Sequence, residues 1–466
     1  MKTRFVLLIL LGASSYAQTG TFTATGNMTV PRAFHTATLL PNGKVLIAGG
    51  SATLELYDPR TGTFTATGAM TASNVVSATV LPDGRVLLIE YRNAELYDPS
   101  TGTVTATGSM VDGQGSALPP GVRGHATLLT NGKVLMTGSG NPQLYDPSTG
   151  AFTLTDPYAN VYDHDDDFQT TVTLLPSGEV LFAEDLQYVR NYSAELYNST
   201  TNTFRPTGAM VSFLLWRTTT LLVNGKVLRA GGVDLFCGCQ KAEQYDPATG
   251  MFTATGDMTT PRNFHTAVLL PDGTVLITGG AGQRGSLASA ELYDSSTGTF
   301  TATGSMTAGR QYHAATALND GRVLITGGMY FDGIHPPYGS LLSAEIYTPP
   351  VLIPAPALFS ISDDGRGPGA IWHAQTGQIA SADNPAVAGE ALSMYTTSLV
   401  DGGAVPPQVA VGGRLTQVLY FGAAPGYPGY TQVNFLVPGG VPPGPAVPVR
   451  LTYIGRSSNA VTVGVQ

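Results

Sequence analysis

Apolar runs alternate with short polar turns along most of this chain, and the pattern is clearest at residues 265–280, HTAVLLPDGTVLITGG. Two runs rich in Val, Leu and Ile flank a Pro-Asp-Gly turn, and two glycines follow the second run. Because Asp272-Gly273 supplies a residue that can adopt a positive φ, the segment predicts a β-hairpin. The hairpin occurs seven times, with turn glycines at Gly43, Gly84, Gly132, Gly178, Gly225, Gly273 and Gly321.

Each hairpin belongs to a repeat of 41 to 48 residues that holds two further apolar segments. In the sixth repeat these are 290–294, which contains Glu-Leu-Tyr, and 299–306, which follows a Thr-Gly turn. Four short strands in a repeat of this length are typical of a β-propeller blade. We expect the tyrosine of the third segment to lie in the core; it recurs at Tyr57, Tyr97, Tyr145, Tyr197, Tyr245, Tyr293 and Tyr347.

The order of the segments indicates how the ring closes. The fourth-strand sequence Thr-Gly-Thr-Phe-Thr-Ala-Thr-Gly occurs first at 19–26, ahead of every hairpin, and is missing after Tyr347. We therefore expect the N-terminal strand to form the outer strand of the last blade, which closes the ring without a free edge. The pattern predicts a seven-bladed β-propeller over residues 18–349.

The composition changes after the last repeat. Residues 350–356 are rich in proline, which is typical of a linker between domains. Six short alternating segments follow within 357–466, at 392–395, 409–411, 418–421, 432–437, 447–453 and 461–465. Turn residues separate them, which predicts a small Ig-like β-sandwich and makes the whole chain all-β.

The repeats resemble the kelch family. The matching features are the double glycine, the tyrosine strand, an aromatic residue on the fourth strand, and Arg-x-x-His starts at Arg32/His35, Arg262/His265 and Arg310/His313. The resemblance covers roughly residues 19–349 and implies the fold, but kelch propellers include both enzymes and binding platforms. The C-terminal segment, with motifs such as Asn384-Pro385-Ala386, resembles a domain of unknown function found on many exported bacterial proteins.

The N-terminus and the net charge bear on location and partners. Lys2 and Arg4 precede an apolar stretch at 5–11 and the small-residue site Ser15-Tyr16-Ala17, which predicts a signal peptide over residues 1–17. No later segment reaches the roughly 18 apolar residues of a membrane span. We expect a monomer that is secreted, periplasmic or on the cell surface. A formal charge of −9 without Lys/Arg clusters argues against nucleic acid or an anionic membrane as partner.

The long connections are predicted to share one face of the ring. Strand order places the short first-to-second and third-to-fourth turns on one face, and the second-to-third and blade-to-blade connections on the other. The second set varies most, at 112–124, 156–168, 185–193, 233–241 and 329–342. Variable loops on a rigid scaffold are typical of a binding face. We predict that this face recognises a carbohydrate or a protein; the alternative is loops that contact nothing.

Two acidic segments of the fourth repeat lie on this face. Its start contains Asp163, His164, Asp165, Asp166 and Asp167, and Glu184-Asp185 replaces the double glycine, as Glu90-Tyr91 does in the second repeat. Close carboxylates repel one another unless a cation or basic group lies among them. We predict that Asp163, Asp165 and Asp167 bind a hard cation such as Ca²⁺, or that this rim receives a cationic or hydroxyl-rich ligand. The alternative is a solvated loop.

The last repeat resembles the corresponding blade of galactose oxidase-type copper radical enzymes, through Arg310-Gln311-Tyr312-His313, 320–323 and 345–350. The resemblance implies Tyr312 and His313 as copper ligands. No residue matches the cysteine that cross-links to the second tyrosine of that family, and His373, the sole histidine of the C-terminal domain, lacks the matching surroundings. Since copper needs the full ligand set, the sequence does not predict a copper centre.

Two further features leave alternatives open. Cys237 and Cys239 are the only cysteines, and in an oxidising compartment they predict a strained bridge, with a redox role as the alternative. Arg310, Tyr312 and His313 are candidate binding residues, but the Arg-x-x-His pairs also suit a framework that is hydrogen-bonded between blades. The main prediction is a binding or interaction protein without catalytic residues, and the alternative is a degenerate oxidase of the galactose oxidase type.

Overall fold

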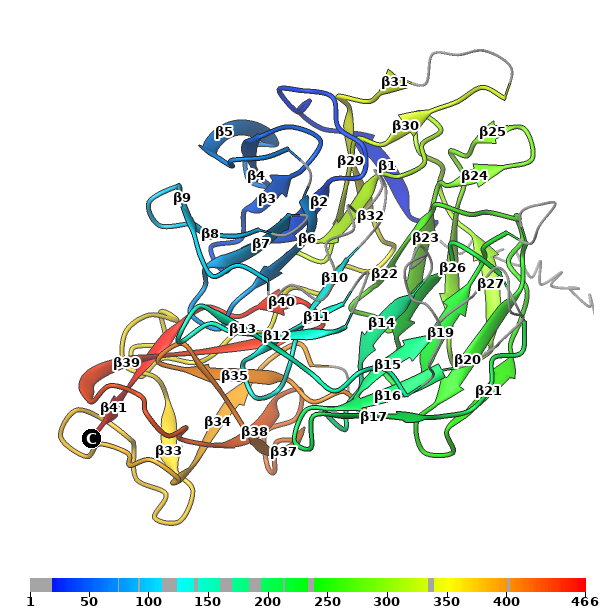
Figure 1. Cartoon of the computed structure of the whole chain (residues 1–466). Helices are drawn as coiled ribbons and strands as arrows, with labels where there is room; N and C mark the ends of the chain where they lie inside the picture. Colours follow the sequence, from blue (N-terminus) through cyan, green and yellow to red (C-terminus); the bar gives the residue numbers. More distant parts are fainter. Residues whose placement is uncertain are drawn as a thin grey trace, which may run out of the picture.

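The computed structural model describes residues 19–73, 75–90, 93–110, 124–137, 141–159, 170–183, 194–212, 214–233, 239–333, 339–399 and 403–466. These residues form strands and turns only, so the protein is all-β, as the repeats predict (Figure 1). In this part of the chain no helix is long and apolar enough to cross a membrane.

Seven antiparallel four-stranded sheets form the blades of a propeller, numbered one to seven in chain order (Figure 1). Each innermost strand contacts the innermost strands of both neighbouring blades, and β28 contacts both β22 and β2, so the ring is closed. The innermost strands are β2 (Thr36–Leu39), β6 (Val75–Val80), β10 (His125–Leu128), β14 (Thr171–Leu174), β18 (Thr218–Leu221), β22 (Thr266–Leu269) and β28 (Ala314–Ala317).

The second strand of each blade is buried along its length, because neighbouring blades cover both of its faces. This explains why these strands are continuous apolar runs rather than alternating ones. They are β3 (Val45–Ala48), β7 (Val86–Glu90), β11 (Val134–Thr137), β15 (Val180–Ala183), β19 (Val227–Ala230), β23 (Val275–Thr278) and β29 (Val323–Thr326).

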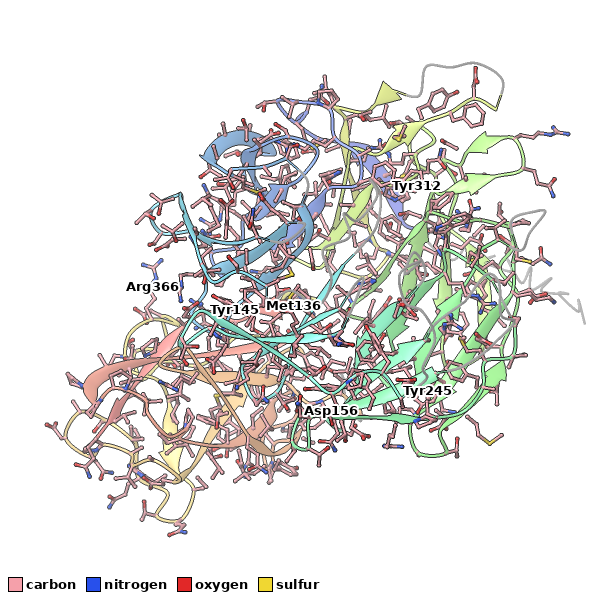
Figure 2. All side chains as sticks on the ribbon, in the orientation of Figure 1. Met136, Tyr145, Asp156, Tyr245, Tyr312 and Arg366 are labelled. Atoms are coloured by element: carbon pink, nitrogen blue, oxygen red, sulfur yellow. The ribbon has the colours of Figure 1, made fainter. Side chains whose placement is uncertain are left out.

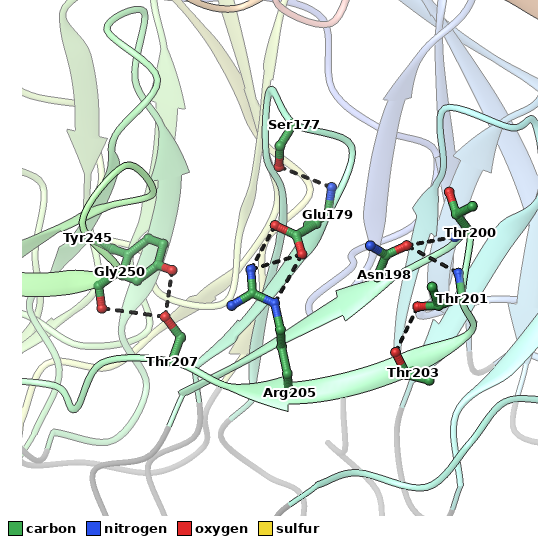
Figure 3. Close-up of polar contacts among 10 residues, drawn as sticks. All are labelled: Ser177, Glu179, Asn198, Thr200, Thr201, Thr203, Arg205, Thr207, Tyr245 and Gly250. Atoms are coloured by element: carbon green, nitrogen blue, oxygen red, sulfur yellow. Dashed lines mark hydrogen bonds and ion pairs between the residues drawn. The ribbon is translucent and has the colours of Figure 1, made fainter.

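The third strands carry the repeated tyrosines, all of which are buried, as predicted. Their rings fill apolar clusters formed between adjacent blades. Six of their hydroxyls bond a threonine of the preceding blade that lies in its outer strand or directly after it, as Tyr245 does with Thr207 in Figure 3. The third strands are β4 (Thr53–Asp58), β8 (Ala94–Asp98), β12 (Gln143–Asp146), β16 (Ala194–Asn198), β20 (Ala242–Asp246), β26 (Ala290–Asp294) and β32 (Ala344–Thr348).

The outer strand of blade seven comes from the N-terminal end of the described chain. β1 (Thr21–Ala24) pairs with β32 from Thr21 opposite Thr348 to Ala24 opposite Glu345. The outer strands of the other blades follow their own third strands: β5 (Thr63–Ala69), β9 (Thr103–Ala106), β13 (Ala151–Leu154), β17 (Thr203–Pro206), β21 (Met251–Ala254) and β27 (Thr299–Ala302). In the sixth repeat this strand ends at Ala302, four residues before the predicted end, because the chain leaves the sheet towards the next blade.

The C-terminal domain is a β-sandwich with one apolar core between its two sheets. One sheet contains β33 (Ile371–His373), β34 (Ala391–Thr396), β38 (Thr431–Leu436) and β37 (Val418–Ala423). The other contains β36 (Arg414–Thr416), β35 (Gln408–Val411), β39 (Gly444–Tyr453), β40 (Arg456–Ser457) and β41 (Val461–Val465).

The sandwich lies against the propeller face that carries the short first-to-second turns (Figure 1). The Ala404 N–H donates to the Val223 carbonyl at 2.7 Å, and the Ala355 N–H donates to the Asn319 carbonyl at 2.6 Å. A cavity of about 650 Å³ lies between the innermost strands and the sandwich. One mouth of the channel is therefore covered by the sandwich. Among the described residues no second domain covers the opposite face, which we call the open face.

Two small hairpins rise from the open face at blades six and seven (Figure 1). They are β24–β25 (Ala281–Gly282 and Gly285–Ser286) and β30–β31 (Met329–Tyr330 and Gly339–Ser340). The Ser286 N–H donates to the Phe331 carbonyl at 2.8 Å, which joins the two hairpins. They form a wall beside the channel mouth.

Candidate functional site

The arginine of each Arg-x-x-His pair lies inside its own blade. The Arg310 guanidinium donates to the Gly327 and Ser343 carbonyls at 2.8 and 3.1 Å and to Glu345 at 2.6 Å. Burial lowers the pKa of Arg310, and the adjacent Glu345 carboxylate offsets part of this effect. The same kind of buried ion pair joins Arg32 to Glu55 and Arg262 to Glu291. These arginines connect the start of a blade to its third strand.

The histidine of each pair reaches into the preceding blade. His313 Nε2 lies 2.9 Å from the hydroxyls of both Thr266 and Thr278. His265 and His35 make equivalent contacts with Thr218 and Thr326, at 3.0 and 2.8 Å. Burial, helped by the Arg262 charge, lowers the pKa of His265 to about 3, so that ring is neutral at pH 7. Of the predicted binding residues, Arg310 is thus bonded within blade seven and His313 is bonded to blade six, and both side chains are buried.

Tyr312 has a different setting, since it belongs to a row of stacked aromatic rings. Its ring centroid lies 4.2 Å from that of Phe34 and 4.3 Å from that of Phe264, with 34° between the planes in both pairs. The Phe264 ring in turn lies 4.6 Å from that of Trp216. Blades one, seven, six and five each supply one ring, and we call these four side chains the aromatic arc.

Each residue of the aromatic arc has a left-handed backbone, with φ of 57° at Phe34, 58° at Trp216, 53° at Phe264 and 55° at Tyr312. This conformation is unfavourable for large side chains and is retained only where the surroundings impose it. Here the Phe34 N–H donates to the Tyr312 carbonyl at 3.1 Å, and the Tyr312 N–H donates to the Phe264 carbonyl at 3.2 Å. The backbone of the arc is therefore linked across blades one, seven and six.

The aromatic arc lies on the open side of the ring, where the innermost strands begin. Figure 2 shows Tyr312 in the half of the propeller that lies away from the sandwich. Phe34 is 43% exposed and Trp216 is 40% exposed, at the two ends of the arc. Single exposed aromatic residues are common on protein surfaces, but contiguous exposed apolar patches mark binding sites.

Several predicted features lie outside the described residues. These are the acidic residues Asp163, His164, Asp165, Asp166, Asp167, Glu184 and Asp185, together with Cys237 and the signal peptide at 1–17. The proposed calcium site in the fourth repeat and the Cys237–Cys239 bridge therefore stay predictions.

The copper ligands that the oxidase alternative needs do not converge. His313 faces the threonines of blade six, and both ring nitrogens of His373 are engaged within the sandwich, by Glu390 at 2.5 Å and the Asn384 carbonyl at 3.0 Å. No cluster of three or more His, Cys, Asp or Glu side chains that could hold a metal occurs in the described ranges. In the described part of the chain His313 and His373 are therefore each engaged in contacts other than with a metal.

No family model and no curated protein matches this sequence. A solved oxidase has the same fold. It is a fungal alcohol oxidase of the AA5 family in complex with copper, which superposes with a TM-score of 0.59 over 97% of this chain and 99% of that chain. Sequence identity is 16%, so the likeness shows a shared architecture over both domains and leaves the chemistry of this chain to its own residues.

Sequence reasoning singled out Tyr312 but missed the arc to which it belongs. A signal was present, because an aromatic residue directly precedes the histidine in all three Arg-x-x-His motifs, and Trp216 occupies the same place in blade five. The resemblance to the kelch family rests on the arginine and the histidine of each motif, and the aromatic residue lies between these two. Only the closed ring brings the four side chains together.

Proposed function

We propose that this protein is an exported propeller that binds a hydroxyl-rich ligand, a carbohydrate, on its aromatic arc. The observation that carries the proposal is the row of adjacent rings on the open face, which is exposed at its two ends, Phe34 and Trp216. Export rests on the predicted signal peptide, and ligand binding accords with the variable loops of this face.

The two exposed end rings, Phe34 and Trp216, suit the apolar faces of sugars, because the rings between them have their faces against their neighbours. The face of an aromatic ring carries partial negative charge, and the C–H groups on a sugar-ring face carry partial positive charge. The hydroxyls at the sugar's edge would contact polar groups of the surrounding loops. Aromatic side chains also lose little conformational entropy on binding, and the linked backbone of the arc holds its rings in place before the ligand arrives.

Truncating the exposed ends of the arc should weaken carbohydrate binding. We expect Trp216→Ala and Phe34→Ala each to raise the Kd for the tightest-binding member of a panel of neutral oligosaccharides about tenfold, equivalent to about 1.4 kcal/mol. The measurement is isothermal titration calorimetry on the full chain. The control is Met251→Ala, which removes an exposed apolar side chain from the outer strand β21.

Two results would contradict the carbohydrate proposal. One is a full panel without binding, and the other is a bound oligosaccharide whose Kd is unchanged in both arc variants. Thermal unfolding of each variant checks that the fold is retained, because both substitutions lie at left-handed positions. If Trp216→Ala and Phe34→Ala weaken binding of a protein ligand and not of a sugar, the arc is a protein-recognition site.

An oxidase of the galactose oxidase type is the second candidate, and the shared fold with a copper-bound alcohol oxidase favours it. Because His313 and His373 are both engaged in other contacts, we expect the purified chain to retain no stoichiometric copper after loading with Cu(II) and dialysis. Elemental analysis measures this directly. One retained copper per chain, lost in His313→Ala and accompanied by alcohol-dependent oxygen consumption, would favour the oxidase.

A further inference from the structure

Four blades neutralise the buried glutamate of the third strand with arginine. In blade six, Arg262 donates to Glu291 and also to the carbonyls of Gly279 and Ser289. We call this set of one carboxylate and two backbone carbonyls the oxygen cradle. Blades one and seven repeat it around Arg32 and Arg310. In blade five, where leucine replaces the usual arginine, two other arginines, Arg217 and Arg229, reach Glu243 instead. In these four blades the third-strand glutamate is therefore paired with a guanidinium, even where the arginine comes from a different position.

Blade two keeps the glutamate of this cradle but has no arginine at the repeat position. Glu95 is the third-strand carboxylate, and it accepts bonds from the Thr71 N–H and hydroxyl, the latter at 2.8 Å. Glu90 replaces the first glycine of the double-glycine motif and accepts a bond from the Ala72 N–H at 3.2 Å. The two side chains thus bring two carboxylates to the Thr71–Ala72 turn. Blades one, five, six and seven instead pair one third-strand carboxylate with arginine.

The Glu90 carboxylate is only partly satisfied. The residue is 2% exposed, and no hydrogen-bond donor among the described residues reaches its Oε2 atom. Burial raises the pKa of Glu90, and the nearby Glu95 charge raises it further. Among the described residues neither carboxylate forms an ion pair, and two buried carboxylates without a positive partner are strongly unfavourable. Blade three avoids the problem by carrying the neutral Gln143 at the position of Glu95.

We propose that Glu90 and Glu95 form a binding site for one divalent hard cation, of which Ca²⁺ is the best match. Two carboxylates balance its charge, and carboxylate, carbonyl and hydroxyl oxygens are the ligands it prefers. The Thr71 hydroxyl lies beside Glu95. The Asn93 carbonyl accepts the Glu90 N–H, as the Ser289 carbonyl beside the blade-six guanidinium accepts the Gly279 N–H. The cation takes the position that the arginine guanidinium occupies in blades one, six and seven.

Calcium binding to chelator-treated full-length protein tests the site. We expect Glu90→Gln to bind one calcium ion fewer per chain than the wild type by equilibrium dialysis. The rise in Tm that calcium causes should shrink in the same variant, because a ligand that binds only the folded state stabilises it. The control is Glu179→Gln, which breaks an ion pair with Arg205 on the surface of blade four and should bind as many calcium ions as the wild type (Figure 3).

The comparison of variants isolates this site from any calcium bound by the acidic loop of the fourth repeat. Equal calcium stoichiometry in the wild type and in Glu90→Gln would overturn the proposal. A wild type that binds no calcium and gains stability as the pH falls from 7 to 5 would also overturn it, since a shared proton would then neutralise the pair. Should Glu90→Gln fail to fold, Glu90→Gly restores the glycine of the other blades and must show the same loss of one ion.

Discussion

Removing residues 18–28 should destroy the cooperative unfolding of the propeller or cause it to aggregate. The deletion removes β1, which completes blade seven, and with it the bonds from the Thr25 N–H to the Ala344 carbonyl and from the Gly304 N–H to the Gly20 carbonyl. It also removes Met28 from the apolar cluster between blades seven and one. The β32 edge would then be exposed, and unpaired edges promote association between chains.

The truncation is measured by thermal unfolding and by size-exclusion chromatography beside the mature full-length chain. A synthetic peptide of residues 18–28 provides the matched control, because it can pair with the open edge of β32. We expect the peptide to restore a monomeric elution volume and part of the lost Tm. A truncated protein that is monomeric and melts at the full-length temperature would show that β1 contributes little to closure.

Replacing Tyr293 by Ala should lower the free energy of unfolding by about 3–5 kcal/mol, the usual cost of deleting a large buried aromatic side chain. The ring is buried between blades five and six, and its centroid lies 4.6 Å from that of Phe300. Its hydroxyl lies 2.9 Å from that of Thr255 and accepts a bond from the Gln244 amide. The variant therefore loses packing and interblade hydrogen bonds together.

Chemical denaturation of the wild type and of Tyr293→Ala measures this difference in unfolding free energy. A second variant, Tyr293→Phe, separates the contribution of packing from that of the hydrogen bonds. The phenylalanine variant retains the ring and loses the hydroxyl bonds, so we expect it to cost about 1 kcal/mol. If Tyr293→Ala cost less than about 1 kcal/mol, the scale of a mild substitution, the ring would not be part of the interblade core.

Local sequence patterns were enough to predict most of the architecture. Turn glycines with apolar flanks define hairpins because strand formation and tight turns depend on neighbouring residues. The repeat length then indicated propeller blades, and the early fourth-strand sequence at 19–26 placed a closing strand that the structure pairs with β32. The burial of the repeated tyrosines followed from their place on a strand that is covered on both sides.

The candidate sites depended on contacts that no local pattern contains. Phe34, Trp216, Phe264 and Tyr312 lie far apart in the chain, and they stack only because the closed ring brings blades one, seven, six and five together. The sequence offered an interblade framework as one interpretation of the Arg-x-x-His pairs, and the tertiary structure places His313 against Thr266 and Thr278 of blade six.

The pair of buried glutamates in blade two also depends partly on the sequence and partly on the tertiary structure. The sequence by itself determined that Glu90 replaces a glycine and that the arginine of the repeat is missing. Only the tertiary structure decided that Glu90 and Glu95 approach one turn and are both buried. The physical reason is that strand and turn propensities act between near neighbours, whereas burial and charge balance are set by the residues that packing brings together from distant strands.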